Sequence, residues 1–543
     1  MKTIESYDQI PYESFAIPET HPDALAPLAR LLGIPAADPE RCRVLELGAA
    51  SGGNLIPMAV HLPASQFVGV ELSAAQAGRG QALIRALGLT NIQLIHQDIL
   101  DVDTEQARFD YILVHGVYSW VPEPVKEHIL WLCGRLLAPQ GIVYLSYNTL
   151  PGWRQRDMVR DMLLHQCRDA HAPTERLGRA RELIERLHRA LDGDTRPESE
   201  PLRRELAYLR TARASYLYHE YLEETNSPEL FSQVMARAQR HGLAYLAETK
   251  LHSMFAATLG PAAEAALAPI ETRIEREQLL DFMSLRAFRQ TLLIRAEATP
   301  CLEINLDHLR DFGLHADLVP LEDTRLDRVA PGRYAATDGA RFQVEHPLTK
   351  AILERLGAIY PNARRLDALL PEAMAEVRDA GGDTHAEQVD ACLAELFNLY
   401  VSQGIGLTLR RAHWPTAIGE RPRASALARA QAAAGEGHVA SVRHRGLGLD
   451  PLATRLLMLL DGQRDRERLL ADIMDAIRAD PALDAGLASD QDAETGHAPG
   501  PAIDTETFAT LAPASLDRLL ALLARAGLLV TDPSPALPPT TIH

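Results

Sequence analysis

Long hydrophobic runs and paired cysteines are both missing from this sequence of 543 residues. No apolar run approaches the roughly 18 residues that cross a bilayer, and the N-terminus lacks the apolar core of a secretory signal. The five cysteines are an odd number, lie far apart and form no CxxC pair, which argues against a disulfide framework. These absences exclude membrane-spanning and secreted classes, and we expect a cytoplasmic protein.

Positive charge is also in short supply. Lys and Arg number 55 against 73 Asp and Glu, which gives a formal net charge of −18. Lysine occurs only four times, at Lys2, Lys126, Lys250 and Lys350. An acidic chain repels a phosphate backbone, so nucleic acid is not the expected partner, whereas a cationic substrate would be attracted. The content of 46% hydrophobic and 24% charged residues is ordinary for a globular protein of several domains.

Short apolar runs alternate with helical patterns between residues 41 and 150. The runs are RVLELG, FVGVELS, IQLIHQDIL, FDYILVHGV and GIVYLSYN. This alternation predicts an α/β fold with a parallel, doubly wound, Rossmann-like sheet that carries helices on both faces. Two later runs, GLAYLAETKLH (242–252) and FRQTLLIRAE (288–297), predict antiparallel strands that close the same sheet.

The pattern divides the chain into five segments. They are an N-terminal arm and helix (1–40), the sheet core (41–150, with its closing strands in 230–298), a helical insertion (151–229), a middle domain (299–420) and a C-terminal domain (421–543). Helices alternate with short strand pairs in the last two, which favours small α/β units of winged-helix type. Residues 484–505 predict a flexible loop, and the tail from about residue 532 predicts disorder. We expect substrate docking or dimer contacts from this region.

A glycine turn joins the first predicted strand to the helix after it. The motif is Glu46-Leu47-Gly48-Ala49-Ala50-Ser51-Gly52-Gly53-Asn54, a near match to the G-x-G-x-G turn of nucleotide-binding folds. Such a turn lets backbone amides approach a ligand at a helix N-terminus. Glu71 ends the second strand, nineteen residues after Gly52, where its carboxylate can accept hydrogen bonds from both ribose hydroxyls. Asp98 ends the third strand, where its carboxylate can bind an adenine amino group. The three features together predict a nucleoside-containing ligand.

S-adenosylmethionine (SAM) suits this site better than NAD. The G-x-G-x-x-G form typical of NAD sites is absent, and Glu46, two residues before the first glycine, can lie near the methionine amino group of SAM. The predicted cofactor-binding residues are Glu46, Gly48, Ala50, Gly52, Asn54, Glu71, Leu72, Asp98, Ile99 and His115, the last at the end of the fourth strand. We predict no metal site, because His219-Glu220-Tyr221 lacks a second histidine at zinc-binding spacing.

The sequence resembles the class I SAM-dependent methyltransferases, and within them the family that carries a methyltransferase regulatory domain. The resemblance spans about residues 7–300 and rests on YDQIPYESFAIPETHPDALAPLARLLG, LELGAASGGNLIPMA, HGVYSWVP…SYNTLPGW, YLYHEYLE…FSQVMARAQRHGLAYLAE and DFMSLRAFRQTLLIR. A weaker likeness continues in ARAQAAAGEGHVASVRHRGLGLDPLATRLLMLLDG. One departure is Ala49-Ala50, where many class I enzymes carry a Cys, Thr or Ala followed by Gly. A methyl group at position 50 narrows the turn, so we expect weakened SAM binding.

That family includes rickettsial-type methyltransferases that act on lysines of outer-membrane proteins. The resemblance therefore implies methyl transfer to protein lysine side chains, with a surface or outer-membrane protein as partner and a homodimer as a further hypothesis. Three alternatives stay open: methylation of a small molecule, a SAM-binding regulatory module without turnover, and RNA methylation, which the charge of −18 disfavours.

A lysine acceptor must lose its proton before it can accept a methyl group. At pH 7 and an unperturbed pKa near 10.4, only about one lysine in 2,500 is neutral, and desolvation between aromatic walls raises that fraction. The residues expected to form these walls follow the fourth and fifth strands, whose ends face the methyl donor in class I folds. The candidates are Tyr118, Trp120, Tyr147, Asn148 and Trp153, and the predicted catalytic residues among them are Tyr118, Trp120, Asn148 and Trp153. Packing of the tryptophans against the insertion is the alternative.

Overall fold

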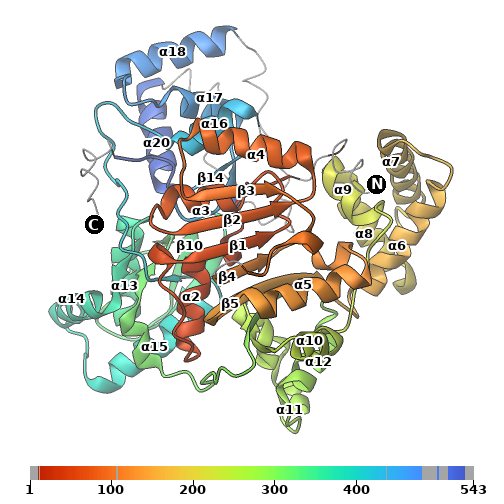
Figure 1. Cartoon of the computed structure of the whole chain (residues 1–543). Helices are drawn as coiled ribbons and strands as arrows, with labels where there is room; N and C mark the ends of the chain where they lie inside the picture. The colour runs from red at the N-terminus through yellow and green to blue at the C-terminus, as the bar shows by residue number, and fades with distance from the viewer. Residues whose placement is uncertain are drawn as a thin grey trace. The chain divides into compact units, whose positions relative to one another are not determined.

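The computed structural model describes residue 10 and residues 13–105, 108–435, 437–479, 498–499 and 512–531. The chain separates into two compact units (Figure 1). The first comprises residues 1–14 and 19–305, and the second comprises residues 15–18 and 306–543. The predicted loop at 484–505 lies outside the described residues except for a two-residue strand, and the predicted disordered tail from residue 532 lies outside them altogether.

A seven-stranded sheet forms the centre of the first unit, in the order β3-β2-β1-β4-β5-β7-β6. Its strands are β1 (Arg43–Leu47), β2 (Gln66–Glu71), β3 (Ile92–His96), β4 (Phe109–Val114), β5 (Leu137–Asn148), β6 (Leu243–Glu248) and β7 (Phe288–Arg295). The first five strands pair in parallel, whereas β7 runs antiparallel to both β5 and β6. The strand order reverses between β1 and β4, so a ligand is expected at the carboxyl ends of these strands.

Helices cover the sheet because its strands are apolar on both faces. Apart from the four helices described below, the helices of this unit are α2 (Pro22–Leu31), α3 (Leu55–His61), α4 (Ala74–Ala86), α5 (Glu123–Leu136), α10 (Phe231–Arg240), α11 (Pro261–Leu267) and α12 (Arg273–Ser284), of which α11 packs against α12. On one face, Leu130 of α5 and Val234 of α10 join Leu145 and Tyr147 of β5 in a single apolar core. This core fixes the strand ends that carry the candidate site.

Four helices between β5 and α10 pack around an apolar core of their own. They are α6 (Trp153–Gln166), α7 (Pro173–Ala190), α8 (Glu200–Thr211) and α9 (Ala214–Tyr221). Arg-rich outer faces surround this core, and Glu175 pairs with Arg179 one turn further along α7 at 2.6 Å. Among the described residues, none of the helices combines the length and apolar content that crossing a bilayer requires.

Within its described residues, the second unit contains three small sheets, each of three strands. Their strands are β8 (Gly313–His315), β9 (Leu318–Pro320), β10 (Gly332–Ala336), β11 (Arg341–Val344), β12 (Arg364–Arg365), β13 (Gly406–Thr408), β14 (His438–Ala440), β15 (Gly446–Gly448) and β16 (Ala498–Pro499). The helices are α13 (Pro347–Ile359), α14 (Leu366–Asp379), α15 (Ala386–Val401), α16 (Ala426–Ala434), α17 (Pro451–Leu459), α18 (Arg466–Ala479) and α20 (Ala512–Arg525). Helices α16, α17, α18 and α20 share one leucine-rich core.

Candidate functional site

The glycine turn lies between β1 and α3, and three of its residues have left-handed backbone. The φ angles are +80° at Gly48, +48° at Ala50 and +78° at Gly52. A Cβ atom at Gly48 would lie 2.4 Å from Cγ2 of Val117, so that position requires glycine. Ala50 adopts the same backbone region with a side chain, which costs about 1–2 kcal/mol relative to an ordinary conformation.

Glu71, the last residue of β2, holds the glycine turn in place. Its Oε2 accepts a hydrogen bond from the Ala50 amide at 2.8 Å, and its Oε1 accepts one from the Ser73 amide at 2.8 Å. Burial raises the pKa of the Glu71 carboxyl, and the amide donors oppose part of that rise. A carboxylate has about four acceptor positions, so each oxygen can still accept a hydrogen bond from a hydroxyl group. Leu72, the next residue, leaves 44% of its surface exposed beside this carboxylate.

Glu46 has a buried carboxylate, and only one of its two oxygens accepts a hydrogen bond from a described residue. Thr20 donates from its hydroxyl to Oδ1 of Asn54 at 3.0 Å, and Nδ2 of Asn54 donates to Oε1 of Glu46 at 2.8 Å. Oε2 of Glu46 has no hydrogen-bond partner among the described residues, although the side chain is only 3% exposed. Burial raises the pKa of Glu46 to about 7. A buried, half-satisfied carboxylate is costly unless a ligand completes it, and a cationic group would do so.

Asp98 and Ile99 follow β3 rather than belonging to it. The predicted strand IQLIHQDIL ends at His96, which pairs with Glu71, and Asp98 caps the short 3-10 helix Ile99–Asp101 by accepting from the Leu100 amide at 2.9 Å. An Asp that accepts from its own downstream amide favours a turn over continued strand, which explains the early end. Asp98 is half-buried and lies beyond the end of the strand next to Glu71.

His115 follows β4 and begins a chain of hydrogen bonds across the sheet edge. Its Nδ1 lies 2.9 Å from the Tyr144 hydroxyl, which accepts from Nε2 of Gln290 at 3.0 Å, and Oε1 of Gln290 accepts from the Thr249 hydroxyl at 3.2 Å. Burial lowers the pKa of His115 to about 4, so the imidazole is neutral at pH 7.

The four predicted catalytic residues differ in how much of their surface is exposed. Tyr118 is 1% exposed, and its hydroxyl accepts from Arg237 at 2.7 Å. Asn148 is 5% exposed and donates to Oδ1 of Asn226 at 3.1 Å. Trp153 is wholly buried, with an edge-to-face contact of 6.3 Å between its ring centroid and that of Trp120. Trp120 alone of the four keeps part of its surface open.

The N-terminal arm reaches the same edge of the sheet. The Gly53 amide donates to the Ser14 hydroxyl at 2.8 Å, and Glu19 lies 3.4 Å from Nζ of Lys250, two residues after β6. Tyr7 and Tyr12, earlier in the arm, lie outside the described residues. No local pattern in the sequence indicates that Glu19, Tyr144 and Gln290, which lie far apart in the chain, meet at this edge.

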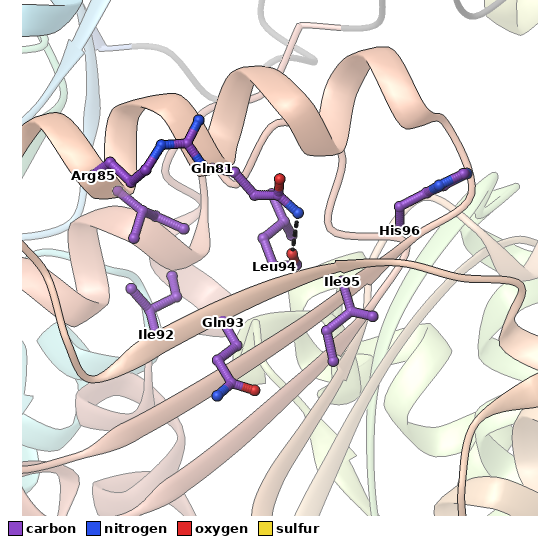
Figure 2. A pocket seen from close by; sticks show the side chains of 8 residues that line it. Gln81, Arg85, Ile92, Gln93, Leu94, Ile95 and His96 are labelled. Carbon is purple, nitrogen blue, oxygen red and sulfur yellow. Dashed lines mark hydrogen bonds between the residues drawn. The ribbon is translucent and has the colours of Figure 1, made fainter.

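A separate groove lies on the outer side of edge strand β3, against α4 (Figure 2). It measures about 380 Å³, and in it Nε2 of Gln81 donates to the Leu94 carbonyl at 2.8 Å (Figure 2). None of its eight lining residues belongs to the glycine turn or was predicted as a site residue. The candidate site is therefore the carboxyl edge of the sheet and not this groove.

Known proteins resemble this chain along most of its length. Residues 44–141 match the family model described as a methyltransferase domain, residues 213–295 a predicted methyltransferase regulatory domain, and residues 420–528 the PKMT C-terminal winged helix domain. The uncharacterized protein RP789 of Rickettsia prowazekii is 32% identical over 475 residues, which are 86% of this chain and 85% of that protein. The solved structure of PKMT2 from Rickettsia typhi in complex with AdoHcy covers 96% of this chain and 100% of PKMT2, with 28% identity and a TM-score of 0.82.

The chain belongs to the PKMT family of class I methyltransferases. The predicted α/β class with a Rossmann-like sheet is thereby confirmed, and so is the winged-helix type predicted near the C-terminus. In this PKMT-family enzyme, the methyltransferase match begins inside β1 and spans the glycine turn, Glu71, Asp98 and His115. The regulatory-domain match begins at the N-terminus of α9 and ends with β7, the strand that carries Gln290. Both matched domains therefore contribute residues to the candidate site.

Proposed function

We propose that this protein transfers methyl groups from SAM to lysine side chains of a protein substrate. The observation that carries the proposal is the overall match to PKMT2, combined with a buried carboxylate that lacks a partner beside the glycine turn. A surface or outer-membrane protein is the proposed substrate class, and a homodimer is the proposed assembly. We also propose the five-segment division given above as the functional division of the chain.

The residues at the glycine turn fit SAM. The free oxygen of Glu46 has the charge and burial that suit the methionine ammonium group, since a buried carboxylate gains most from a cationic partner. Glu71 has acceptor positions left for ribose hydroxyls, and Asp98 has one carboxylate oxygen beyond the one that caps its helix. The remaining residues of the proposed cofactor site are Gly48, Ala50, Gly52, Asn54, Leu72, Ile99 and His115.

SAM supplies an electrophilic methyl group on a sulfonium. The protein has to hold an amine in line with that methyl group and to let the amine lose its proton, and alignment alone can supply several kcal/mol of the barrier. We propose that Trp120, in edge-to-face contact with Trp153, lowers the water content around the amine together with Tyr118 and Asn148 at the same strand ends. Since desolvation disfavours an ammonium ion, it raises the fraction of neutral lysine. Neutral His115 adds no positive charge to this edge.

A transfer assay tests the proposal. The purified chain is incubated with methyl-labelled SAM and a lysate of its own cells, and the label is sorted into protein, RNA and small-molecule fractions. We expect label in the protein fraction, released by acid hydrolysis as methyl-lysine. Label confined to small molecules or RNA would contradict the proposal in favour of those substrates. Absence of label despite measurable SAM binding would favour a binding module without turnover.

Replacement of Ala50 by glycine is expected to tighten SAM binding about threefold. The change removes a methyl group where the backbone approaches the cofactor, and it relieves about 1–2 kcal/mol of left-handed strain at φ +48°. Glycine also gives the unfolded chain more backbone freedom, which offsets about 0.5–1 kcal/mol of this gain. The free energy of unfolding should therefore rise by only about 0.5 kcal/mol. Calorimetric titration with SAM measures the first effect and denaturant unfolding the second. Weaker binding by Ala50→Gly would mean that the methyl group packs against the cofactor.

A further inference from the structure

Lysine is scarce in this protein, and the described lysines differ sharply in their surroundings. Lys126 and Lys350 are fully buried and donate to groups inside their own units, Lys126 to Glu229 at 3.0 Å and Lys350 to the Ala330 carbonyl. Lys250 instead has a side chain that is 43% exposed, and its Nζ lies 3.4 Å from Oε1 of Glu19. Of the lysines that the structure describes, Lys250 is thus the one whose amine can leave its partner at little cost.

Lys250 and Glu19 lie at the candidate site. Strand β6 runs parallel to β5, because both are antiparallel to β7, so Lys250 follows the carboxyl end of its strand on the same edge as His115. The preceding residue, Thr249, is the last member of the hydrogen-bond chain through Gln290 and Tyr144 to His115. Through that chain, the end of β6 is connected to the end of β4.

Glu19 is held between this edge and the glycine turn. The next residue, Thr20, is wholly buried and bonded to Asn54, which in turn donates to Glu46. On the other side, the Glu19 charge opposes the effect of burial on the pKa of His115. A partly exposed carboxylate, 23% accessible, therefore lies within electrostatic range of the residue that follows β4 and next to a residue anchored at the proposed cofactor site.

The ion pair between Glu19 and Lys250 is weak enough for another ammonium group to replace Lys250. Its 3.4 Å separation is longer than the 2.7–2.9 Å of a strong charge-assisted hydrogen bond, and such partly exposed pairs contribute only about 0–1 kcal/mol. An incoming ammonium group can therefore displace Lys250. Phe288 is 42% exposed, and its ring lies 6.3 Å from that of His115, which offers apolar surface for the methylene stem of a lysine.

We propose that Glu19 receives the ammonium group of the substrate lysine, and that Lys250 occupies this carboxylate when no substrate is bound. The proposal rests on lysine methylation as the function and names the residue that selects the amine. Glu19 would bind the charged form first, and the ammonium would then release its proton to water as the side chain moves between the aromatic walls.

Two substitutions with opposite expected signs test this inference. Glu19→Gln keeps the shape and removes the charge, so the half-saturating concentration of acceptor should rise about five- to tenfold, while kcat changes less than twofold. Lys250→Met removes the amine that competes for Glu19, so the half-saturating concentration of acceptor should fall about threefold. The acceptor is the lysate protein fraction of the transfer assay, methyl-lysine is the product counted, and AdoHcy affinity by calorimetry should be unchanged in both variants. Glu19→Asp should recover part of the loss.

Glu175→Gln is the matched control, since Glu175 is an exposed glutamate paired with Arg179 on α7. The inference is overturned if Glu19→Gln behaves like Glu175→Gln. It is also overturned if Lys250→Met raises the half-saturating concentration as Glu19→Gln does, because the pair would then only support the fold. If the unmodified protein forms no methyl-lysine at all, lysine methylation itself is contradicted, and that result is recognisable before any variant is made.

Discussion

Glu71→Ala is expected to lower SAM affinity at least 100-fold, as measured by calorimetric titration. The carboxylate accepts from the amides of Ala50 and Ser73, so its loss leaves two turn donors without their acceptor and removes the proposed ribose contact together. Hydrogen bonds to charged groups contribute about 1.5–3 kcal/mol each, and a 100-fold change corresponds to about 2.7 kcal/mol. The effect is large because one side chain both shapes the turn and binds the cofactor.

Glu71→Gln separates these two roles. A glutamine at this position keeps one acceptor oxygen for the turn but has no charge, so we expect an intermediate loss of SAM affinity, about tenfold. Glu175→Gln should bind SAM normally and controls for the removal of a glutamate charge. SAM affinity left unchanged by Glu71→Ala would contradict the proposed cofactor site, provided that the far-ultraviolet circular dichroism spectrum shows the variant to be folded.

Glu46→Gln is expected to weaken SAM binding about 30- to 100-fold at pH 7.5 and to abolish its pH dependence. The amide keeps an acceptor for Nδ2 of Asn54, but it places an NH2 group where the free carboxylate oxygen would face an ammonium. Loss of one partner from a buried charge pair costs about 2–5 kcal/mol, which agrees with that range. The unmodified protein serves as the reference across the pH series.

The sign of the pH effect follows from the pKa of Glu46, which burial raises from 4.5 to about 7. A cationic ligand binds the ionised carboxylate, so binding lowers this pKa and releases a proton. Affinity should therefore fall up to tenfold per pH unit below pH 7, and about 0.5 proton should be released at pH 7. Titrations in two buffers with different ionisation enthalpies measure that release. No release by the unmodified protein would contradict the role given to Glu46.

The same raised pKa affects the unliganded protein in the opposite direction. Folding favours the protonated carboxyl of Glu46, so its contribution to stability is fully present below the unfolded pKa near 4.5. That contribution is lost as the pH rises through about 7. Cofactor binding compensates for this loss in the range where the free protein is weakened.

Local sequence patterns predicted most of the parallel sheet and the glycine turn. Apolar runs between turn residues mark β1 to β5, and the order of strand ends correctly indicated that Glu71 and the glycine motif are neighbours, as the bond from the Ala50 amide to Glu71 shows. Position 50 also shows why the pattern was recognisable without its central glycine. Alanine tolerates a left-handed backbone at modest cost, so the turn keeps its shape despite the substitution.

The rest of the site depends on contacts that no local pattern encodes. Glu19 meets Lys250 across more than two hundred residues, and Gln290 reaches Tyr144 only because β7 pairs with β5 in one particular register. The sequence also did not indicate which of the predicted aromatic side chains are buried. Trp120 and Trp153 look alike as aromatic residues after a strand, yet only Trp120 keeps exposed surface, whereas Trp153 starts α6 and its ring lies against that of Tyr221 in α9.

The position of β7 constrains how the protein is made. This strand is the last of the sheet to be synthesised, but it lies between β5 and β6 and pairs with both. At about 5–20 residues per second, a ribosome needs roughly 7–30 s to proceed from the end of β5 to the end of β7. Throughout that interval the outer edge of β5 in the nascent chain has no strand partner, and an unpaired edge is a site of aggregation. Rapid packing of the intervening helices, or a chaperone on the ribosome, would protect the half-built sheet.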